Sequence, residues 1–534
     1  GLGDVYKRQS YSYTTNRVGN EVSTDLNSTN ETAGDRRIYL EAMVDYNRTF
    51  GRHDVNAMLL YNQDELVNNV PGNNLINSLP KRKQGLAGRL SYAYDGKYMA
   101  EVNMGYNGSE NFAKGHRWGF FPSIALGYNI SEESFFEPLR KVITSMKLRG
   151  SWGLVGNDQI GGERFIYMPT INLSGKGFTT GIDQNYGLSG PVYTRYENNS
   201  ITWEVGEKIN LGIDLQLLNS LNIVVDIFRE TRRDIFQKKG TIPTYLGTGN
   251  TDVFGNLAEM KNQGLDLSID YNKAFSKDFY MNFKGTFTYA HNEITKYDEA
   301  PKYAFQSKVG QSANVSQGYL SNGLFLDEAE IDRYNQQMGS TLGAGDIKYL
   351  NVSNMHGYGD DIVDVDDWTW IGNPTVPEIV YGFGPSFKYK NWDFSFFFQG
   401  VAKTSLFMSG FHPFGDNSLR NVLQFVANDR WSPTNQNVDA KYPRLTRKTS
   451  LNNTNPGNSG RTSDYWMRDG SFLKLKNAEV GYTFKGWRFY LSGQNLLTFS
   501  PFDYWDPEMG SGSGMKYPTQ RIINFGIQVT FNNK

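Results

Sequence analysis

The chain has 534 residues, a formal net charge of −1 from 54 basic and 55 acidic side chains, and no cysteine. This charge balance lacks the basic excess of nucleic-acid-binding proteins, and the missing cysteines exclude disulfide and thiol chemistry within this chain. No apolar run approaches the ~20 residues of a transmembrane helix, but aromatic residues make up 14% of the chain and glycines number 56, a mixture that suits strands and turns.

Apolar and polar residues alternate in the manner of β-strands about fifteen times along the chain. The first stripe of alternate apolar positions comprises Ile38, Leu40, Ala42, Val44 and Tyr46. Later stripes follow at Val55–Tyr61, Leu90–Tyr94, Tyr98–Tyr106, Ile209–Leu217, Ile223–Ile227, Leu265–Tyr271, Phe283–Tyr289, Trp392–Phe398, Val480–Phe484, Trp487–Leu491 and Ile523–Phe531. Tight turns are predicted between them at Gly51–His53, Asp95-Gly96, Asn219-Ser220, Ser276–Asp278, Asn391 and Lys485-Gly486.

Long polar connections alternate with these tight turns. The longest are Asn157–Ser200, His291–Val376 and Lys403–Arg468. Short turns on one side and long loops on the other are typical of outer-membrane barrels. We therefore predict an all-β fold, an antiparallel transmembrane β-barrel with short periplasmic turns, long extracellular loops, lipid outside and water inside. The polar phase, which would face the lumen, holds Asp214, Gln216, Asp226, Asp266, Asp270, Lys284 and Lys474.

The amino terminus has no initiator methionine and no signal peptide. Its first nine residues, GLGDVYKRQ, are similar to a peptide produced by translating sequencing-adapter DNA. We expect residues 1–9 to be a non-native leader and residues 10–534 to be the carboxy-terminal part of a longer protein.

Several blocks of sequence resemble one family. They are DGKYMAEVNMGYNGSENF and RWGFFPS within 95–123, KLRGSWGLVGN at Lys147–Asn157, DRWSPTNQNVDAKYPRL at Asp429–Leu445, DGSFLKLKNAEVGYTF at Asp469–Phe484 and GQNLLTFSPFDYWDPE at Gly493–Glu508. In this order they are similar to the SusC/RagA-type TonB-dependent transporters of the Bacteroidetes outer membrane. The resemblance covers nearly everything after Arg37.

The resemblance implies a barrel of about 22 strands around a plug. About fifteen strands are recognisable here, so the plug, the TonB-interacting segment and the first strands are expected to lie outside this chain. The family's function implied is active import of oligosaccharide or peptide nutrients across the outer membrane. A SusD-like surface lipoprotein would act as the lid, and the TonB–ExbB–ExbD complex would supply energy through the plug. No cofactor and no covalent chemistry are implied.

No catalytic or metal-ligating set stands out. The five histidines are scattered without metal-ligand spacing: His53, His116, His291, His356 and His412. Ser151 lies in Arg-Gly-Ser-Trp-Gly, where Arg149 occupies the position of the glycine that a nucleophile elbow needs. Gly510, Gly512 and Gly514 form a flexible tract with no helix after it to receive a phosphate. An enzyme is therefore the least favoured class.

An acidic run, 360–367, is the one candidate cation site. The family often has a calcium-like loop in this stretch, with oxygen ligands at alternate positions. Here His356 and Tyr358 stand at the first two ligand positions and Asp361 replaces the turn glycine. The three carboxylates that remain, Asp360, Asp364 and Asp367, either hold a hard cation weakly or form a solvated acidic loop, and we favour the loop.

Six aromatic residues in the long loops allow two interpretations: Tyr358, Trp368, Trp370, Trp431, Tyr465 and Trp466. Their flat faces suit stacking on sugar rings, or they pack the loops against each other or a partner, and we favour packing. Two rivals to the importer stay open. One is a soluble secreted all-β glycan-binding protein, which predicts apolar stripes packed face to face. The other is a passive outer-membrane porin.

Overall fold

The structure is a computed structural model. It describes residues 34–68, 76, 79–161, 164–243, 252–334, 336–337, 342–411, 414, 421–447, 453 and 462–531. The expected leader, residues 1–9, lies outside the described residues. Within them, no helix is long and apolar enough to cross a membrane.

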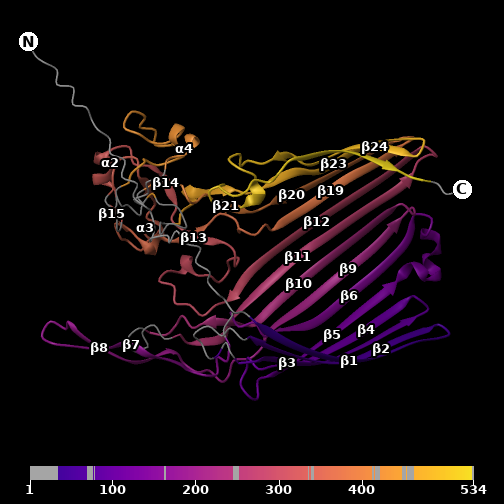
Figure 1. Cartoon of the computed structure of the whole chain (residues 1–534), viewed down its shortest axis with the longest axis horizontal. Helices are drawn as coiled ribbons and strands as arrows, with labels where there is room; N and C mark the ends of the chain where they lie inside the picture. Colours follow the sequence, from indigo (N-terminus) through magenta and orange to yellow (C-terminus); the bar gives the residue numbers. More distant parts are fainter. Residues whose placement is uncertain are drawn as a thin grey trace, which may run out of the picture.

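A single 15-stranded sheet dominates the described part of the chain, and every neighbouring pair of its strands is antiparallel (Figure 1). In spatial order its strands are β1 (Asp35–Phe50), β2 (His53–Asn68), β3 (Lys81–Tyr94), β4 (Tyr98–Ser109), β5 (Trp118–Asn129), β6 (Ile143–Asn157), β9 (Glu204–Leu217), β10 (Leu221–Lys238), β11 (Phe254–Ala274), β12 (Phe279–Lys296), β19 (Ile379–Tyr389), β20 (Trp392–Ala402), β23 (Phe472–Phe484), β24 (Trp487–Phe499) and β25 (Ile522–Val529). Strand order follows chain order, as in an up-and-down barrel wall. The end strands β1 and β25 lie apart, so the wall is open (Figure 1).

Tight turns join the strands at one end of the sheet. Asp95 and Gly96 both have positive φ, 54° and 67°, as a type I′ hairpin turn requires. Lys485 and Gly486 do the same, with φ of 47° and 84°. These two predicted turns are confirmed.

One predicted turn is shifted by a residue. The positive-φ pair is Leu218 and Asn219, at 50° and 54°, and not Asn219 and Ser220. The strand pairing explains the shift, because Leu221 pairs with Leu217 and leaves residues 218–220 to make the connection. Leu218 must then adopt a left-handed backbone, which the residue type gives no reason to expect.

Long connections gather at the opposite end of the sheet, and they contain secondary structure of their own (Figure 1). Within the predicted loop Asn157–Ser200, β7 (Thr170–Thr180) and β8 (Tyr186–Arg195) form a hairpin. The loop predicted to begin at His291 starts later, because β12 stays paired with β11 as far as Lys296.

The last two long connections contain short elements. These are η4 (Ala304–Gln306), β13 (Ser316–Gly318), β14 (Ser321–Leu324), α2 (Glu328–Arg333), β15 (Gln336–Gln337), β16 (Ile347–Tyr349), α3 (Val352–Met355), β17 (Ile362–Val363), η5 (Val365–Asp367), β18 (Thr369–Ile371), β21 (Ser405–Phe407), α4 (Gln424–Asn428), η6 (Asp464–Trp466) and β22 (Met467–Asp469). Two 3-10 helices, η1 (Ile130–Glu132) and η2 (Ser134–Leu139), lie between β5 and β6, and η7 (Pro507–Met509) lies between β24 and β25.

The last strand is shorter than the predicted Ile523–Phe531. β25 ends at Val529, which pairs with Trp487, the first residue of β24. Beyond Trp487 the partner strand enters the turn at Lys485-Gly486, so Phe531 has no strand residue opposite it. Ile523 and Phe525 nevertheless share the apolar face, at 65% and 69% exposure.

Large apolar side chains cover one face of the sheet and remain exposed. Val44 on β1, Leu211 on β9 and Ile227 on β10 are 71%, 63% and 60% exposed. No second sheet of comparable size covers this face within the described residues. The face-to-face packing that a soluble sandwich requires is therefore not the arrangement of this chain.

Replacing Leu211 with Arg tests this assignment of faces. If the apolar face meets lipid, Leu211→Arg should lower the free energy of unfolding by about 2–4 kcal/mol when the residue lies near the bilayer midplane. Asn210→Arg is the matched control, because Asn210 is the neighbouring residue of β9 and points to the polar face. Urea unfolding of the complete protein in lipid vesicles measures both. Equal losses for the two variants would contradict the assignment.

Candidate functional site

Charged side chains on the polar face link neighbouring strands. Arg149 of β6 donates from Nε to Asp214 of β9 at 3.0 Å, and from Nη1 and Nη2 to the two carboxylate oxygens of Asp226 of β10, both at 2.6 Å. Its guanidinium thus spans three strands. Fork-shaped pairing of this kind fixes geometry as well as charge.

A glycine makes this reach possible. Gly212 lies on β9 directly between Arg149 and Asp226 in the strand register. A Cβ at this position would lie 2.6 Å from Cζ of Arg149 and 2.8 Å from Oδ1 of Asp226. A side chain here would displace the ion pair, so glycine is required for close approach. The sequence analysis missed this crossing, and the signal that could have found it is a glycine among the polar-face positions of β9.

The other predicted polar-phase residues are also used on this face. Asp266 accepts a hydrogen bond from Thr288 at 2.7 Å, and Asp270 lies 3.9 Å from Lys284. A second cross-strand arginine, Arg488 of β24, donates to Asp393 at 3.0 Å. The polar face is therefore a rigid wall of fixed charges suited to contact with water and polar solutes.

The long connections fold onto one another around an apolar core, which we name the loop core. Its buried residues are Tyr319, Leu324, Ile347, Tyr349, Val363, Leu406, Met408, Phe411, Phe414, Val426, Trp431, Ala440, Tyr442, Trp466 and Phe502. They come from three connections, 297–378, 403–471 and 500–521. The three loops therefore form one packed body at the end of the wall, which we name the loop body (Figure 1).

A buried ion pair joins two of these loops. Asp346 is fully buried and accepts from Nη2 of Arg444 at 3.0 Å. Its carboxylate also accepts from the amide of Asn453 at 2.6 Å and from the backbone N–H of Gly343 at 2.9 Å. The hydrogen bond from Arg444 to Asp346 raises the pKa of the guanidinium. Full satisfaction of this carboxylate offsets the cost of burying it.

Lys474 connects the third loop to the wall. This residue of β23 is fully buried, and its Nζ lies 2.7 Å from Oδ2 of Asp506 and also binds Glu508. Burial alone would raise the pKa of both carboxyls. For Asp506, the hydrogen bond and charge of Lys474 and the hydrogen bond from the backbone N–H of Glu508 outweigh burial. For Glu508, the hydrogen bonds and charges of Lys474 and Lys476 outweigh burial. Both pKa values therefore lie below their ordinary 3.8 and 4.5.

We expect this contact to hold the loop against the wall only while the carboxyls are ionised. A carboxyl with a lowered pKa in the folded state stabilises the fold above its unfolded pKa, and this stabilisation is lost as pH falls through the folded value. Lys474→Met should lower the free energy of unfolding by about 2–3 kcal/mol. This loss is smaller than for a fully buried ion pair, because both carboxylates remain partly exposed to water. Lys476→Met is the control, because it removes only a contact with Glu508 at 2.8 Å, and it should lower the free energy of unfolding by less than Lys474→Met does.

A spin label on a cysteine at Met515 in the same loop reports the change. Its mobility should rise in Lys474→Met at neutral pH, and in the unmodified chain only below about pH 4. Unchanged mobility in Lys474→Met would show that the ion pair does not hold the loop.

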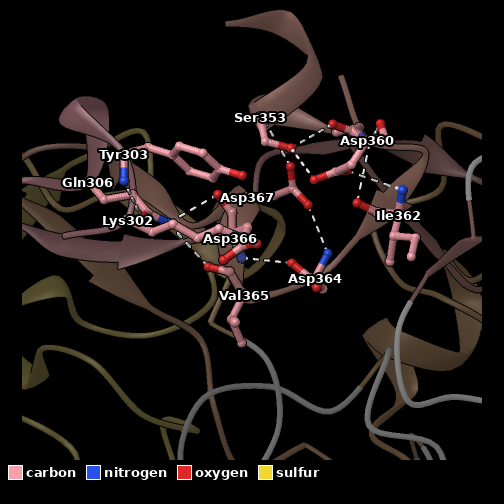
Figure 2. A network of polar contacts seen from close by, with 11 residues as sticks. Lys302, Tyr303, Gln306, Ser353, Asp360, Ile362, Asp364, Val365, Asp366 and Asp367 are labelled. Atoms are coloured by element: carbon pink, nitrogen blue, oxygen red, sulfur yellow. Dashed lines mark hydrogen bonds and ion pairs between the residues drawn. The ribbon is translucent and has the colours of Figure 1, made fainter. Parts of the chain in front are cut away.

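The acidic run does not gather its carboxylates into one cluster (Figure 2). Fully buried Asp367 accepts from the backbone N–H of Ser353 at 2.9 Å and of Asp364 at 2.8 Å, and burial raises its pKa. Asp364 accepts from the backbone N–H of Asp366 at 2.8 Å and so caps the 3-10 helix η5. Each carboxylate organises its own turn.

Asp360 and Asp367 meet at Ser353, whereas Asp366 turns away from them. Asp360 accepts from the Ser353 hydroxyl and the Ile362 backbone N–H, both at 3.2 Å, and Asp366 forms an ion pair with Lys302 (Figure 2). In the described part of the chain, no group of three or more His, Cys, Asp or Glu residues is placed to hold a metal ion. The predicted solvated loop is wrong for Asp367, because its side chain is buried and bonded within the loop.

The loop aromatics mostly pack. Trp431 and Trp466 are buried in the loop core, and Tyr465 and Trp368 pack against it. Trp370 donates its indole N–H to the Ser307 carbonyl at 2.9 Å. Tyr358 differs, since it is 49% exposed with its ring 4.1 Å from that of Tyr303.

The other candidate residues lie far apart in the fold. His53 borders the β1–β2 turn, His291 lies in β12 against Glu378, and His356 stacks on Phe305. His116 lies in the connection after β4, and His412 lies outside the described residues. Ser151 lies within the extended strand β6, where it pairs with Ala125 and Asn210. A nucleophile elbow needs a strand-to-helix turn, which this position does not have.

Comparison with known proteins places this wall in a family. A sequence model of the family described as "TonB dependent receptor-like, beta-barrel" matches residues 1–496. TonB-dependent receptor P3 of Formosa agariphila is 25% identical over 575 residues, covering 96% of this chain and 54% of the relative. TonB-dependent receptor SusC of Bacteroides thetaiotaomicron is 28% identical over 471 residues, covering 83% of this chain and 43% of the relative. The chain thus spans about half the length of these curated relatives.

Solved structures agree on the fold. A structure of the RagAB peptide transporter superposes with a TM-score of 0.67 at 20% identity, covering 93% of this chain and 56% of that chain. The open sheet is thus a partial barrel wall. On its sequence match and its fold, this chain belongs to the TonB-dependent receptor β-barrel family of the outer membrane.

Proposed function

We propose that the chain is the larger part of the wall of an active outer-membrane importer of oligosaccharide or peptide nutrients. The family match over residues 1–496 carries this proposal. A wall with an apolar outer face and a charged inner face supports it. Barrels of about 22 strands enclose a plugged lumen, so the other strands and the plug would come from the part of the protein outside this chain.

Energy for import would come from the TonB–ExbB–ExbD complex, acting on the plug. The relatives P3 and SusC both carry the name TonB-dependent receptor. The wall's own contribution would be mechanical and electrostatic. Pairs such as Arg149–Asp226, which reaches from β6 across β9 to β10, hold strands together, so that the wall stays rigid while the plug moves.

A SusD-like surface lipoprotein would close the lumen from outside by docking on the loop body. The exposed side chains of Met355 and Tyr358, at 69% and 49%, give that body an apolar surface. Exposed apolar patches commonly mark protein interfaces. The resemblance to SusC/RagA-type transporters supports this partner.

An enzymatic role finds no support in the site. Across the part of the chain that the structure describes, histidines, Ser151 and the acidic run each serve separate local contacts. Nucleic-acid binding has no support either, because basic and acidic side chains nearly balance and leave no basic excess.

Growth on defined nutrients tests the function. Deleting the gene should abolish growth of the source organism on one oligosaccharide or peptide as sole carbon source, and disabling TonB should abolish the same growth. Co-purification in mild detergent should recover a surface lipoprotein with the complete transporter. Growth retained without TonB, with ion conduction in a planar bilayer, would instead favour the passive porin.

Cysteine labelling tests the orientation. This chain contributes no competing thiol to the signals of single cysteines at Ile182, which is fully exposed between β7 and β8, and at Ser220 in a tight turn. In intact cells that carry the complete protein, an impermeant thiol reagent should label the cysteine at 182 and not the one at 220. The reverse pattern would overturn the proposed orientation.

A further inference from the structure

A pocket of about 330 Å³ lies where β1 to β4 meet the long loops, and we name it the rim pocket. Its basic lining residues are Arg37, Lys81, Arg82, Lys83 and Arg164, and its acidic ones are Asp64 and Glu110. Arg37 and Asp64 belong to the polar phase of β1 and β2, so the pocket opens on the inner side of the wall, at its extracellular end.

Folded contacts build this pocket. Asp158, 6% exposed, accepts from Nζ of Lys83 at 2.8 Å and from the Ser109 hydroxyl at 2.7 Å, and its carbonyl accepts from Asn111 at 3.1 Å. These bonds attach the start of the loop after β6 to β3 and β4. Ile160 then enters a second buried apolar cluster with Phe112, Ile166, Ile201 and Trp203. The loop that lines the pocket is therefore held in place on both sides.

Three of the five basic residues already have carboxylate partners. Arg37 pairs with Asp64 at 2.6 Å, Lys83 pairs with Asp158 at 2.8 Å, and Arg82 pairs with Glu65 at 2.7 Å. The other two are Lys81 and Arg164. Among the described residues, neither has a carboxylate within ion-pair distance. The rim pocket thus holds two positive charges without an ion pair in the described chain, although Glu110 in its lining attracts Arg164 from a longer distance.

Arg164 is the more unusual of the two because it is buried, at 8% exposure. Nη1 donates to the carbonyls of Ile76 and Leu79, and Nη2 donates to that of Pro80, all at 2.9 Å. Nε has no hydrogen-bond partner. Burial lowers the pKa of this guanidinium.

The hydrogen-bond partners of Arg164 are all neutral carbonyls, and the attraction of Glu110 does not offset the effect of burial on its charge. A buried cation with one unused donor is costly to maintain. A guanidinium is also the side chain best suited to carboxylate and other oxyanions, and an ammonium group nearby adds a mobile point charge. An anionic group in the pocket would receive charge from both Arg164 and Lys81.

We propose that the rim pocket binds a carboxylate group of the imported nutrient, which makes the preferred substrate an acidic oligosaccharide or an acidic peptide. The identification of the ligand as a nutrient rests on the proposed import function. Binding of the carboxylate itself does not require transport, and it can be measured without TonB.

Calorimetric titration of the complete protein in detergent provides the test, with two matched pairs of probes. Trigalacturonate is compared with its methyl ester, and triglutamate with triglutamine, so that each pair differs in charge and little else. At least one charged probe should bind more tightly than its neutral counterpart, and the pair that shows the difference identifies a sugar or a peptide. The preference should weaken as salt rises, because the charges become screened.

Lys81→Gln should weaken binding of that charged probe about three- to fivefold, as expected for one exposed charge. Lys81 is exposed, and its pairing with Leu66 uses the backbone alone, so this variant should fold normally. Arg164→Gln should weaken binding about tenfold or more, although losing its three carbonyl contacts can also affect folding. Lys141→Gln, an exposed lysine at the opposite end of the wall, is the control and should bind as the unmodified protein does.

Equal binding of charged and neutral probes, absence of binding by both charged probes, or unchanged binding in Lys81→Gln would each overturn the proposal. These results are distinguishable from failure of the import function. Charge-selective binding with no TonB-dependent growth would contradict import alone. TonB-dependent growth with charge-independent binding would contradict the rim pocket alone.

Discussion

Backbone pairing between adjacent strands is the constraint on which the whole molecule depends. In hydrocarbon an unpaired N–H or C=O costs several kcal/mol, so each strand must hydrogen-bond along its length to its neighbours. The continuous antiparallel ladder from β1 to β25 meets this demand for thirteen inner strands and leaves one edge open on each end strand. Pairing also fixes side-chain direction, since successive residues point to opposite faces.

Because the ladder fixes the faces, charges can be concentrated on one of them. Arg149 holds β6, β9 and β10 together through Asp214 and Asp226, and this contact needs the space that Gly212 leaves open. Such pairs would be expensive on the apolar face, where no water reaches them. The same separation of faces places the charged lining of the rim pocket on the inner side, where a polar solute can reach it.

The loop body follows a different principle from the wall. Its stability comes from a buried apolar core and from two ion pairs, Asp346–Arg444 and Lys474–Asp506, which join segments far apart in the chain. The core rings therefore serve packing, and Tyr358 is left at the surface. Long connections that would be improbable as free loops are thus accounted for, because they have a core of their own.

The sequence by itself located most strands of the wall and their faces, because a period of two is a local property that neighbouring residues reveal. It gave no alternating stripe for β19 and did not predict the β7–β8 hairpin. It also located turns such as Asp95-Gly96, where residue type dictates the backbone. Only the tertiary structure decided where β25 ends and where the β9–β10 turn is centred, since both depend on the partner strand. The polar contacts of Asp367 and the burial of Arg164 among backbone carbonyls were also decided by the tertiary structure, because the partners lie on segments that come together only in the fold.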